Sequence, residues 1–493
     1  MQKKRKWIAG IVIAVSMAMV LTGALAYLLR TKITVVAPTC LEKGYSVYVR
    51  GGKTQIKDIV DATGHDYSEW EILQAPTGVT EGQRTRTCKV CGWTQTEAFH
   101  MQGCLPQIHL TGDLTGIGKT KQVQVTAQFS IEGTDFDGYA LMKYQGHSSL
   151  QYDKKSFTVK FFSDEECNEK QKFQFSHWNP EHKYILKANY LDTSRSRNLI
   201  CADLWSQMVS MRQRIHPRLQ KTSNLGATDG FPVEVYLNDT FCGTYNMTLH
   251  KDDDLFAMED GQKDGIVIIN QTATPAAFFK EAIDWETSPD WEVEYSGTDS
   301  TAWIKEKTDA FVSFVRSSTD QAFRTELHTY ADVESLIDYL IAMYALGLPT
   351  HAAKDLILAT YEDDVFIASM FDMEEAFGMK KDGSGFEDPV HGLPVEVDGI
   401  LTSGTQSLLW DRMIRNFYPE ICHRYRVLRA QVLSEKNIIM LAEEKINAIP
   451  DYVNQAEFAL YPHQPMQDIS HLDQIKAYTH QRLSLLDQIF GHL

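Results

Sequence analysis

The chain has 493 residues, 43% of them hydrophobic, so it can bury a sizeable core and form roughly two to four domains, or one large two-lobed unit with appendages. Its 65 acidic and 48 basic residues give a formal net charge of −17 at pH 7, and no long basic run offsets it. This balance disfavours a nucleic acid partner held by bulk electrostatics and favours a soluble body that faces an aqueous compartment.

The N-terminal segment 1–32 predicts a membrane anchor. Basic residues at positions 3–6 precede an uncharged, almost wholly apolar run at positions 7–29, which is long enough to span a bilayer. Because more positive charge lies before the run than after it, the N-terminus is expected in the cytoplasm and the rest outside. The alternative is a cleaved signal peptide, since Ala24-Leu25-Ala26 has the small-x-small form that signal peptidase accepts. Either way the body is expected to be exported.

Residues 33–104 differ in composition from the rest and predict a small β-rich module or spacer. The stretch 64–70 followed by a CxxCG motif resembles the short repeat modules of bacterial surface proteins. Cys88-Lys89-Val90-Cys91-Gly92 is half of a zinc-ribbon knuckle, and Cys40 and His65 could supply the remaining ligands. The spacing is irregular and a second CxxC is missing, so the sequence favours a degenerate spacer that folds without zinc. The other cysteines are scattered and are expected to be mostly buried thiols.

The chain from residue 105 to 255 is predicted to be rich in strands. Alternating or nearly alternating apolar residues predict strands at 123–129 and 156–162, and another at 184–190. Asp192, Arg197 and Asn198 then open a predicted helix that runs through Met208.

Two short stretches of this region could contact phosphate. Small residues between the first two strands, including Ser148 and Ser149, would let backbone N–H groups approach an anion, and Lys154 and Lys155 follow them. The start of the predicted helix, with Arg197, is a plausible anion site. The alternative there is an ordinary capped helix with a solvent-facing arginine.

The stretch 354–378 predicts a β-hairpin with acids at its open end. Residues 356–361 and 365–371 are strand-like, and residues 362–364 form an acidic turn between them. Pairing inward from the turn places Asp355 opposite Asp372, and Glu374 follows two residues later. Three converging carboxylates would hold a hard cation such as Mg²⁺. The alternative is an acidic rim on a solvated turn.

The rest of the chain, residues 256–493, is predicted to be mainly helical around this hairpin. Residues 336–346 are apolar enough for a buried helix, which Gly347-Leu348-Pro349 would end. Residues 424–441 and 472–490 carry apolar residues at helical spacing.

Several motifs in order give residues 105–493 a resemblance to a known family. The chain resembles the CotH family of bacterial spore-coat and surface proteins, of which several members are atypical kinases of the secretory-pathway type. The motifs are Gln145-Gly146-His147-Ser148-Ser149 with Lys154-Lys155-Ser156-Phe157, Lys187-Ala188-Asn189-Tyr190-Leu191-Asp192 with Arg197-Asn198, Asp229-Gly230-Phe231-Pro232 with Gly243-Thr244-Tyr245 and Lys251, Phe371-Asp372-Met373-Glu374 with Phe377-Gly378, and Leu409-Trp410-Asp411-Arg412 with Arg424-Tyr425 and Leu428-Arg429.

The resemblance implies an α+β, two-lobed, atypical protein-kinase-like fold, with a β-rich nucleotide-binding lobe at 105–255 and an α-rich lobe at 256–493. It implies an ATP- and Mg²⁺-dependent kinase that phosphorylates Ser or Thr of a protein substrate at the cell surface. The candidates for binding phosphate are Lys154, Lys155 and Lys187, and the sequence does not distinguish among them. Arg197 is a further candidate.

The same resemblance assigns the metal-binding residues and shows that the usual catalytic Asp is missing. Asp355 stands where kinases carry a metal-binding Asn, and Asp372 and Glu374 stand at the metal-binding acids. Five residues before Asp355, where kinases carry the catalytic Asp, this chain has Thr350, whose hydroxyl is no base near neutral pH. His351 is the candidate substitute. The alternative function is a catalytically silent surface protein, a pseudokinase or adhesin, that binds a ligand or partner with the same scaffold.

Overall fold

A computed structural model describes residues 2–29, 32–50, 53–68, 71–74, 82–99, 105–146, 148–222 and 224–491. The chain divides into two compact units, Met1–Met101 and Gln102–Leu493. His147, which belongs to one of the sequence motifs above, and Cys104, one of the scattered cysteines, lie outside the described residues.

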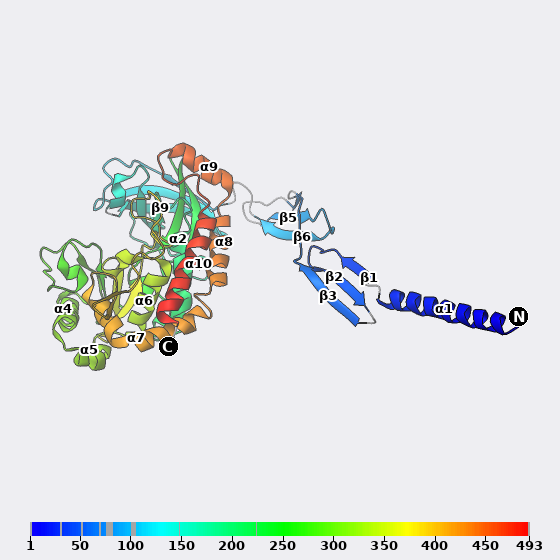
Figure 1. The fold of residues 1–493 in the computed structure, drawn as a ribbon. Helices are drawn as coiled ribbons and strands as arrows, with labels where there is room; N and C mark the ends of the chain where they lie inside the picture. The colour runs from blue at the N-terminus through cyan, green and yellow to red at the C-terminus, as the bar shows by residue number, and fades with distance from the viewer. Residues whose placement is uncertain are drawn as a thin grey trace. The chain divides into compact units, whose positions relative to one another are not determined.

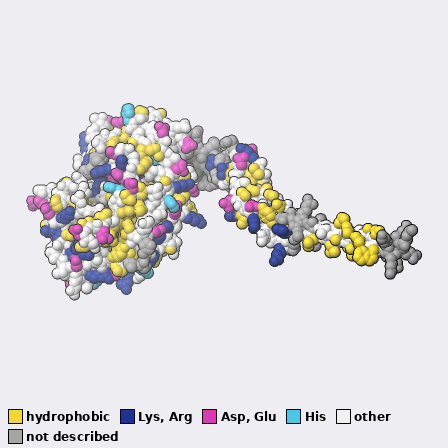
Figure 2. Space-filling view, in the orientation of Figure 1, with side chains coloured by type: hydrophobic (Ala, Val, Ile, Leu, Met, Phe, Trp, Pro, Cys, Tyr) yellow, Lys and Arg dark blue, Asp and Glu magenta, His cyan; other side chains and the backbone are white. Residues whose placement is uncertain are grey.

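The described residues of the first unit form one helix and two small antiparallel sheets (Figure 1). Helix α1 covers Gln2–Leu29, and its described side chains are exposed and largely hydrophobic (Figure 2). One sheet contains β1 (Lys32–Val36), β2 (Gly44–Arg50) and β3 (Lys53–Val60), and the other contains β4 (Glu71–Gln74), β5 (Gly82–Thr87) and β6 (Thr94–Phe99). In the described part of the chain, no helix combines the length and the apolar character needed to cross a membrane.

Seven strands of the second unit close into a barrel in the order β10-β11-β13-β12-β7-β8-β9. In strand β8, Val125, Ala127 and Phe129 are buried and the residues between them are exposed, which is the alternation expected of a strand with one face in a barrel interior. The strands are β7 (Gln107–Thr111), β8 (Val123–Ile131), β9 (Thr134–Gln145), β10 (Ser156–Phe162), β11 (Lys183–Lys187), β12 (Gly230–Leu237) and β13 (Thr240–Leu249).

A four-stranded antiparallel sheet follows, in the order β15-β14-β16-β17. Its central strands β14 (Gly265–Ile269) and β16 (Leu356–Thr360) are wholly buried, because their runs of Ile, Val and Leu are covered on both faces. The flanking strands are β15 (Trp291–Ser296) and β17 (Ile367–Met370), and a separate hairpin pairs β18 (Val395–Val397) with β19 (Ile400–Thr402).

Helices pack around this sheet and beside the barrel (Figure 1). Helix α6 is nearly all buried, begins at the N-cap Asp332 and ends at Gly347, whose φ of 69° a left-handed C-cap requires. The helices are α2 (Arg197–Ser210), α3 (Asp253–Phe256), α4 (Ala302–Ser317), α5 (Asp320–Glu326), α6 (Val333–Leu346), α7 (Leu408–Arg429), α8 (Glu435–Asn447), α9 (Asp451–Leu460) and α10 (His471–Phe490), with short 3-10 turns at η1 (Ser148–Gln151), η2 (Leu219–Lys221), η3 (Pro275–Phe278), η4 (Leu327–Thr329) and η5 (Pro349–Ala352).

The mixed α+β class expected from the sequence is confirmed, and most predicted elements are present. The predicted strand at 184–190 ends earlier, at Lys187, and the helical pattern at 424–441 belongs to two helices, because α7 ends at Arg429 and Ser434 caps the start of α8. The larger of two hydrophobic clusters among the described residues runs through the barrel, the sheet and the helices. The division into two kinase-like lobes stays a prediction.

Candidate active site

A cleft of about 720 Å³ is lined by residues of the barrel and of the four-stranded sheet. Its lining includes nine lysines and eight acidic residues, although acids outnumber bases in the chain as a whole. The lysines are Lys119, Lys143, Lys154, Lys183, Lys187, Lys251, Lys354, Lys380 and Lys381, and the acids are Glu292, Glu294, Asp355, Asp372, Glu374, Glu375, Asp382 and Glu387. A cleft with this composition suits a polyanion accompanied by a cation.

The predicted hairpin forms, but its register differs by one residue from the expected one. Leu356 pairs with Met370, so Asp355 lies opposite Phe371, whose N–H donates to the Asp355 carbonyl at 3.4 Å. The prediction that Asp355 pairs directly with Asp372 is therefore wrong. Both aspartates still border the cleft, and each has a left-handed backbone, with φ of 59° and 57°. Such conformations cost about 1–3 kcal/mol in non-glycine residues and cluster at functional sites.

Two lysine ammonium groups lie among the hairpin acids. Lys187 Nζ, at the end of β11, forms an ion pair with Asp372 Oδ1. Lys354 Nζ lies 2.9 Å from Asp355 Oδ2 and 4.0 Å from Asp372 Oδ2. Within the described residues, Asp355, Asp372 and Glu374 do not form a group whose ligand atoms all lie within 4.8 Å of one another. The sequence predicted converging acids but missed the lysine that lies between two of them.

The surroundings shift the pKa of each acid differently. Burial raises the pKa of Asp372, but Lys187 and Lys354 outweigh it and hold that pKa well below its usual range. Burial raises the pKa of Glu374 to about 7, with Lys187 opposing. Burial also raises the pKa of Asp355, which Lys354 opposes. Asp372 thus favours the ionised form, and Glu374 changes its charge near neutral pH.

These residues fit a hard divalent cation. Asp372 and Glu374 offer carboxylate oxygens within the same cleft, which are the ligands that Mg²⁺ prefers. The Asp372 side chain is 32% exposed, so it can be reached from the cleft, whereas that of Asp355 is only 4% exposed and is paired with Lys354. Asp372 and Glu374 would therefore be the first ligands, and Asp355 is less accessible.

Of the three candidate phosphate-binding lysines, only Lys187 offers its ammonium group to the cleft. Lys154 borders the cleft but is fully buried, and its Nζ bonds Glu457 Oε1 at 2.6 Å and the Ala188 carbonyl at 2.9 Å. Lys155 is absent from the lining, and its Nζ donates to the carbonyls of Leu150, at 2.8 Å, and Tyr152. Lys154 and Lys155 therefore have structural roles, because their ammonium groups bind other parts of the protein.

Arg197 lies in the interior and not at the cleft, so the structure does not support its predicted contact with phosphate. Its guanidinium group donates to the Ala376 carbonyl at 2.7 Å and to Gln474 Oε1 at 2.9 Å, and it pairs with Asp192. The next residue, Asn198, accepts a hydrogen bond from Met373 N at 2.7 Å. The start of α2 thus positions the segment that carries Asp372 and Glu374, because it binds the backbone on both sides of Glu374.

The predicted serine loop is described in part. Ser149 borders the cleft, and Gly146 before it has a φ of 103°. A Cβ at Gly146 would come within 2.1 Å of Ser149 Oγ, so the tight turn requires glycine. The side chain of Ser148 lies outside the described residues.

The structure does not place His351 in the cleft. Its side chain is 1% exposed, its Nε2 lies 3.0 Å from the Phe371 carbonyl and must donate to it, and burial lowers its pKa to about 4. The predicted catalytic base is therefore a neutral residue of the interior.

A carboxylate that the sequence analysis overlooked lies beside Thr350, the residue at the position of the catalytic Asp. The Thr350 hydroxyl donates to Glu375 Oε2 at 2.9 Å, and Glu375 lines the cleft. Burial raises the pKa of Glu375, with Thr350 and Lys354 opposing. The signal available in the sequence was the doubled acid Glu374-Glu375, which only the fold connects with Thr350.

The fold and the cleft define a class of protein: an α+β protein with a closed barrel, a four-stranded sheet and a cleft lined by many charged side chains. The model of a family described as CotH kinase protein matches residues 142–486, and the chain belongs to this family. The match includes Lys187, Thr350 and all the hairpin acids, and it marks the protein as kinase-like. No curated protein matches the chain.

Proposed function

We propose that the protein is a CotH-type kinase that transfers the γ-phosphate of ATP, with Mg²⁺, to a serine or threonine hydroxyl of a protein substrate. The observation that carries the proposal is the Lys187–Asp372 ion pair inside a cleft rich in lysines, within the residues that match the family. A lysine next to a metal-binding aspartate is the combination that positions nucleotide phosphates in kinases.

Each residue has a distinct part in this proposal. Lys187 binds phosphate oxygens and stays charged, because Asp372 and Glu374 raise its pKa against the effect of burial. Asp372 and Glu374 would hold Mg²⁺, which would supply positive charge to offset that of the transferred phosphoryl group. Lys354 lies between Asp355 and Asp372 and would offset their repulsion whenever both are ionised.

Glu375 replaces His351 as the proposed general base. The acceptor oxygen forms a bond to the γ-phosphorus, the bond from that phosphorus to the bridging oxygen of ADP breaks, and the hydroxyl proton passes to the Glu375 carboxylate. The direction of the Glu375 pKa shift favours this role, because a higher pKa makes the carboxylate a stronger base. The hydrogen bond from Thr350 orients the carboxylate.

A catalytically silent surface protein is the second candidate, and two observations favour it. Thr350 stands at the position of the catalytic Asp, and Lys354 supplies within the chain a positive charge between the acids. In that case the cleft would bind a charged ligand or partner without catalysing phosphotransfer.

Nucleotide binding by the unit 102–493, measured with and without Mg²⁺, tests the proposal. We expect ATP to bind more tightly with Mg²⁺, and we expect Asp372→Ala to remove the effect of Mg²⁺ while the fold is retained. Asp382→Asn, an exposed acid at the edge of the cleft, is the matched control. If Mg²⁺ does not improve ATP binding by the parent protein, the acids are not a nucleotide–metal site.

The location of the protein is part of the proposal. The basic cluster and the apolar run at the N-terminus support a single-pass anchor in the bacterial cell membrane, with the body and its protein substrate outside the cell.

A further inference from the structure

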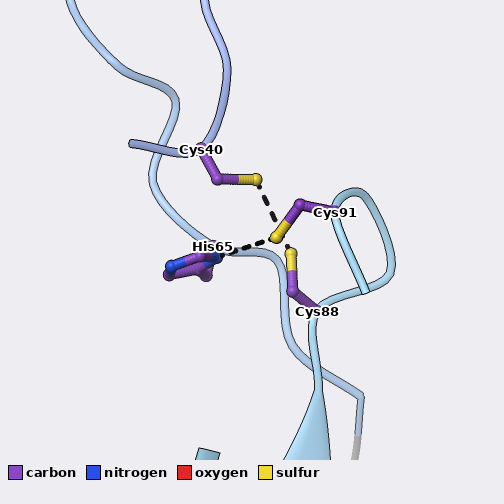
Figure 3. A group of neighbouring side chains, drawn as sticks. All are labelled: Cys40, His65, Cys88 and Cys91. Atoms are coloured by element: carbon purple, nitrogen blue, oxygen red, sulfur yellow. Dashed lines mark hydrogen bonds between the residues drawn. The ribbon is translucent and has the colours of Figure 1, made fainter. Parts of the chain in front are cut away.

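Four side chains of the first unit converge from three separate segments of the chain (Figure 3). They are Cys40 from the loop between β1 and β2, His65 from the segment after β3, and Cys88 and Cys91 from the turn between β5 and β6. One ligand atom of each residue lies within 4.8 Å of the ligand atoms of the other three. The partners that look poorly spaced along the chain are therefore neighbours in space.

The distances within this group match those of a tetrahedral zinc site. Cys40 Sγ lies 3.7 Å from Cys88 Sγ, and Cys91 Sγ lies 3.4 Å from His65 Nδ1. With Zn–S bonds of about 2.3 Å and Zn–N bonds of about 2.0 Å, a regular tetrahedron separates two sulfurs by about 3.8 Å and sulfur from nitrogen by about 3.5 Å. Three thiols and one imidazole form a complete ligand set of the structural type.

The backbone around the group holds the ligands in place. In the CxxCG turn, Gly92 N donates to the Cys88 carbonyl at 2.9 Å, and the φ of 72° at Gly92 is one that glycine readily adopts. Thr63 N donates to the Thr39 carbonyl at 3.0 Å, next to Cys40, and Lys89 N donates to the Asp66 carbonyl at 2.7 Å, next to His65.

The described side chains of the first unit bury little apolar surface, which is the usual source of stability. Among its described side chains, the buried hydrophobic ones are those of Cys40 and Cys88, and every residue of β3 is exposed. The two hydrophobic core clusters contain only residues of the second unit. A module this small with so little apolar burial requires a cross-link or a metal to stay folded. The two buried cysteines belong to the proposed ligand group itself.

We propose that Cys40, His65, Cys88 and Cys91 bind one structural Zn²⁺, which serves as the core of the module between α1 and residue 105. This replaces the expectation of a metal-free spacer, and it does not depend on the proposed kinase function. The rival is a disulfide between Cys40 and Cys88, which an oxidising exterior would favour. A disulfide would involve only Cys40 and Cys88 and would not account for the approach of Cys91 and His65 to them.

Metal analysis of the purified full-length protein tests this proposal. We expect one zinc per chain that survives dialysis, and its loss in Cys88→Ser. Cys167→Ser, a partly exposed cysteine in the second unit, should keep the zinc. His65→Cys should also keep it, because a fourth thiolate completes the set, whereas His65→Ala should weaken retention. Adding Co²⁺ to the metal-stripped protein should give thiolate charge-transfer absorption that Cys88→Ser lacks.

Thiol counting and proteolysis complete the test. Alkylation of the denatured protein, with chelator and without reductant, should find all three of Cys40, Cys88 and Cys91 free, and chelator should expose residues 33–104 to protease. Zinc-free protein with a Cys40–Cys88 disulfide, or zinc that Cys88→Ser leaves unchanged, would overturn the proposal.

Discussion

The charge of Glu374 should make metal-dependent binding sensitive to pH. Burial raises its pKa to about 7, so the side chain is protonated below that pH and cannot serve as an anionic ligand. We expect Mg²⁺-dependent ATP binding to strengthen as the pH rises through about 7 and then to level off. Isothermal titration at several pH values should show this rise in the parent and in Asp382→Asn, and a flat profile in Glu374→Gln.

The same pKa shift has the opposite effect on the stability of the protein without metal. An acid whose pKa is higher in the folded state than in the unfolded chain loses stability as the pH rises between the two values, because the unfolded chain releases its proton first. The contribution of Glu374 should fall between its ordinary pKa of 4.5 and about 7. Metal binding and metal-free stability therefore respond to pH in opposite directions. A metal-free protein whose stability rose over this range because of Glu374 would contradict the assignment.

Glu375 and Thr350 decide between the two candidate functions. If Glu375 is the base, Glu375→Gln should slow phosphotransfer by about 10²- to 10⁴-fold and leave ATP binding nearly unchanged. Glu387→Gln, another acid of the cleft, is the control. Radiolabel transfer from ATP and a separate binding assay give the two measurements. Equal activity of Glu375→Gln and the parent would remove Glu375 from the mechanism.

A silent kinase requires a different variant. Thr350→Asp alone would place a second carboxylate against Glu375, because the two side chains are hydrogen-bonded at 2.9 Å, and the repulsion would raise both pKa values. Thr350→Asp with Glu375→Gln avoids this and restores the acid that kinases carry. Inactivity of the parent with clear autophosphorylation of the double variant would identify a silenced kinase.

At the scale of elements, helix α9 is held to the barrel by a buried ion pair. Glu457 on α9 binds Lys154 Nζ at 2.6 Å, accepts from Thr244 N at 2.6 Å and lies 3.5 Å from Arg195. Burial lowers the pKa of Lys154 to about 8 in spite of Glu457, so the lysine depends on its partner to stay charged. This pair is a structural contact between a helix and a strand end.

Removal of Glu457 should therefore destabilise the fold. We expect Glu457→Ala to lower the free energy of unfolding by about 3–5 kcal/mol, because it leaves a buried ammonium group without its partner. Gln455→Ala, on the exposed face of the same helix, should change it little. Lys187→Ala should weaken ATP binding with a smaller loss of stability in urea denaturation. A larger loss for Lys187→Ala than for Glu457→Ala would reverse the roles assigned to the two lysines.

At the scale of the whole molecule, the proposed topology places the body outside the cytoplasm. The positive charges before the apolar run support this orientation. Protease added to intact cells should digest the region after residue 105, and a cytoplasmic marker protein should stay intact as the control. Protection of this region until the cells are lysed would contradict the proposal.

The sequence by itself determined the elements whose signal is local. The alternation at 123–129 and 156–162 predicted strands because a strand with one buried face repeats every second residue, and Gly347 marked the end of α6 because its left-handed backbone favours glycine. The order of the motifs also determined the family. The acidic end of the hairpin was found, although the register was off by one residue, because the turn is formed by Glu362 and Asp363, both left-handed.

The tertiary structure decided which residues share a site. Lys154, Lys155 and Lys187 look alike in the sequence, and only the packing of α9 and of the 148–152 turn shows that the first two are already occupied. Glu375 and Thr350, and likewise Cys40 and Cys88, are neighbours only because separate segments fold together. The periodicity of a segment shows which face of that one element is buried. The charge state of a side chain, its partners and its part in a metal site depend on segments that are distant in the chain. No local sequence pattern shows that such segments come together.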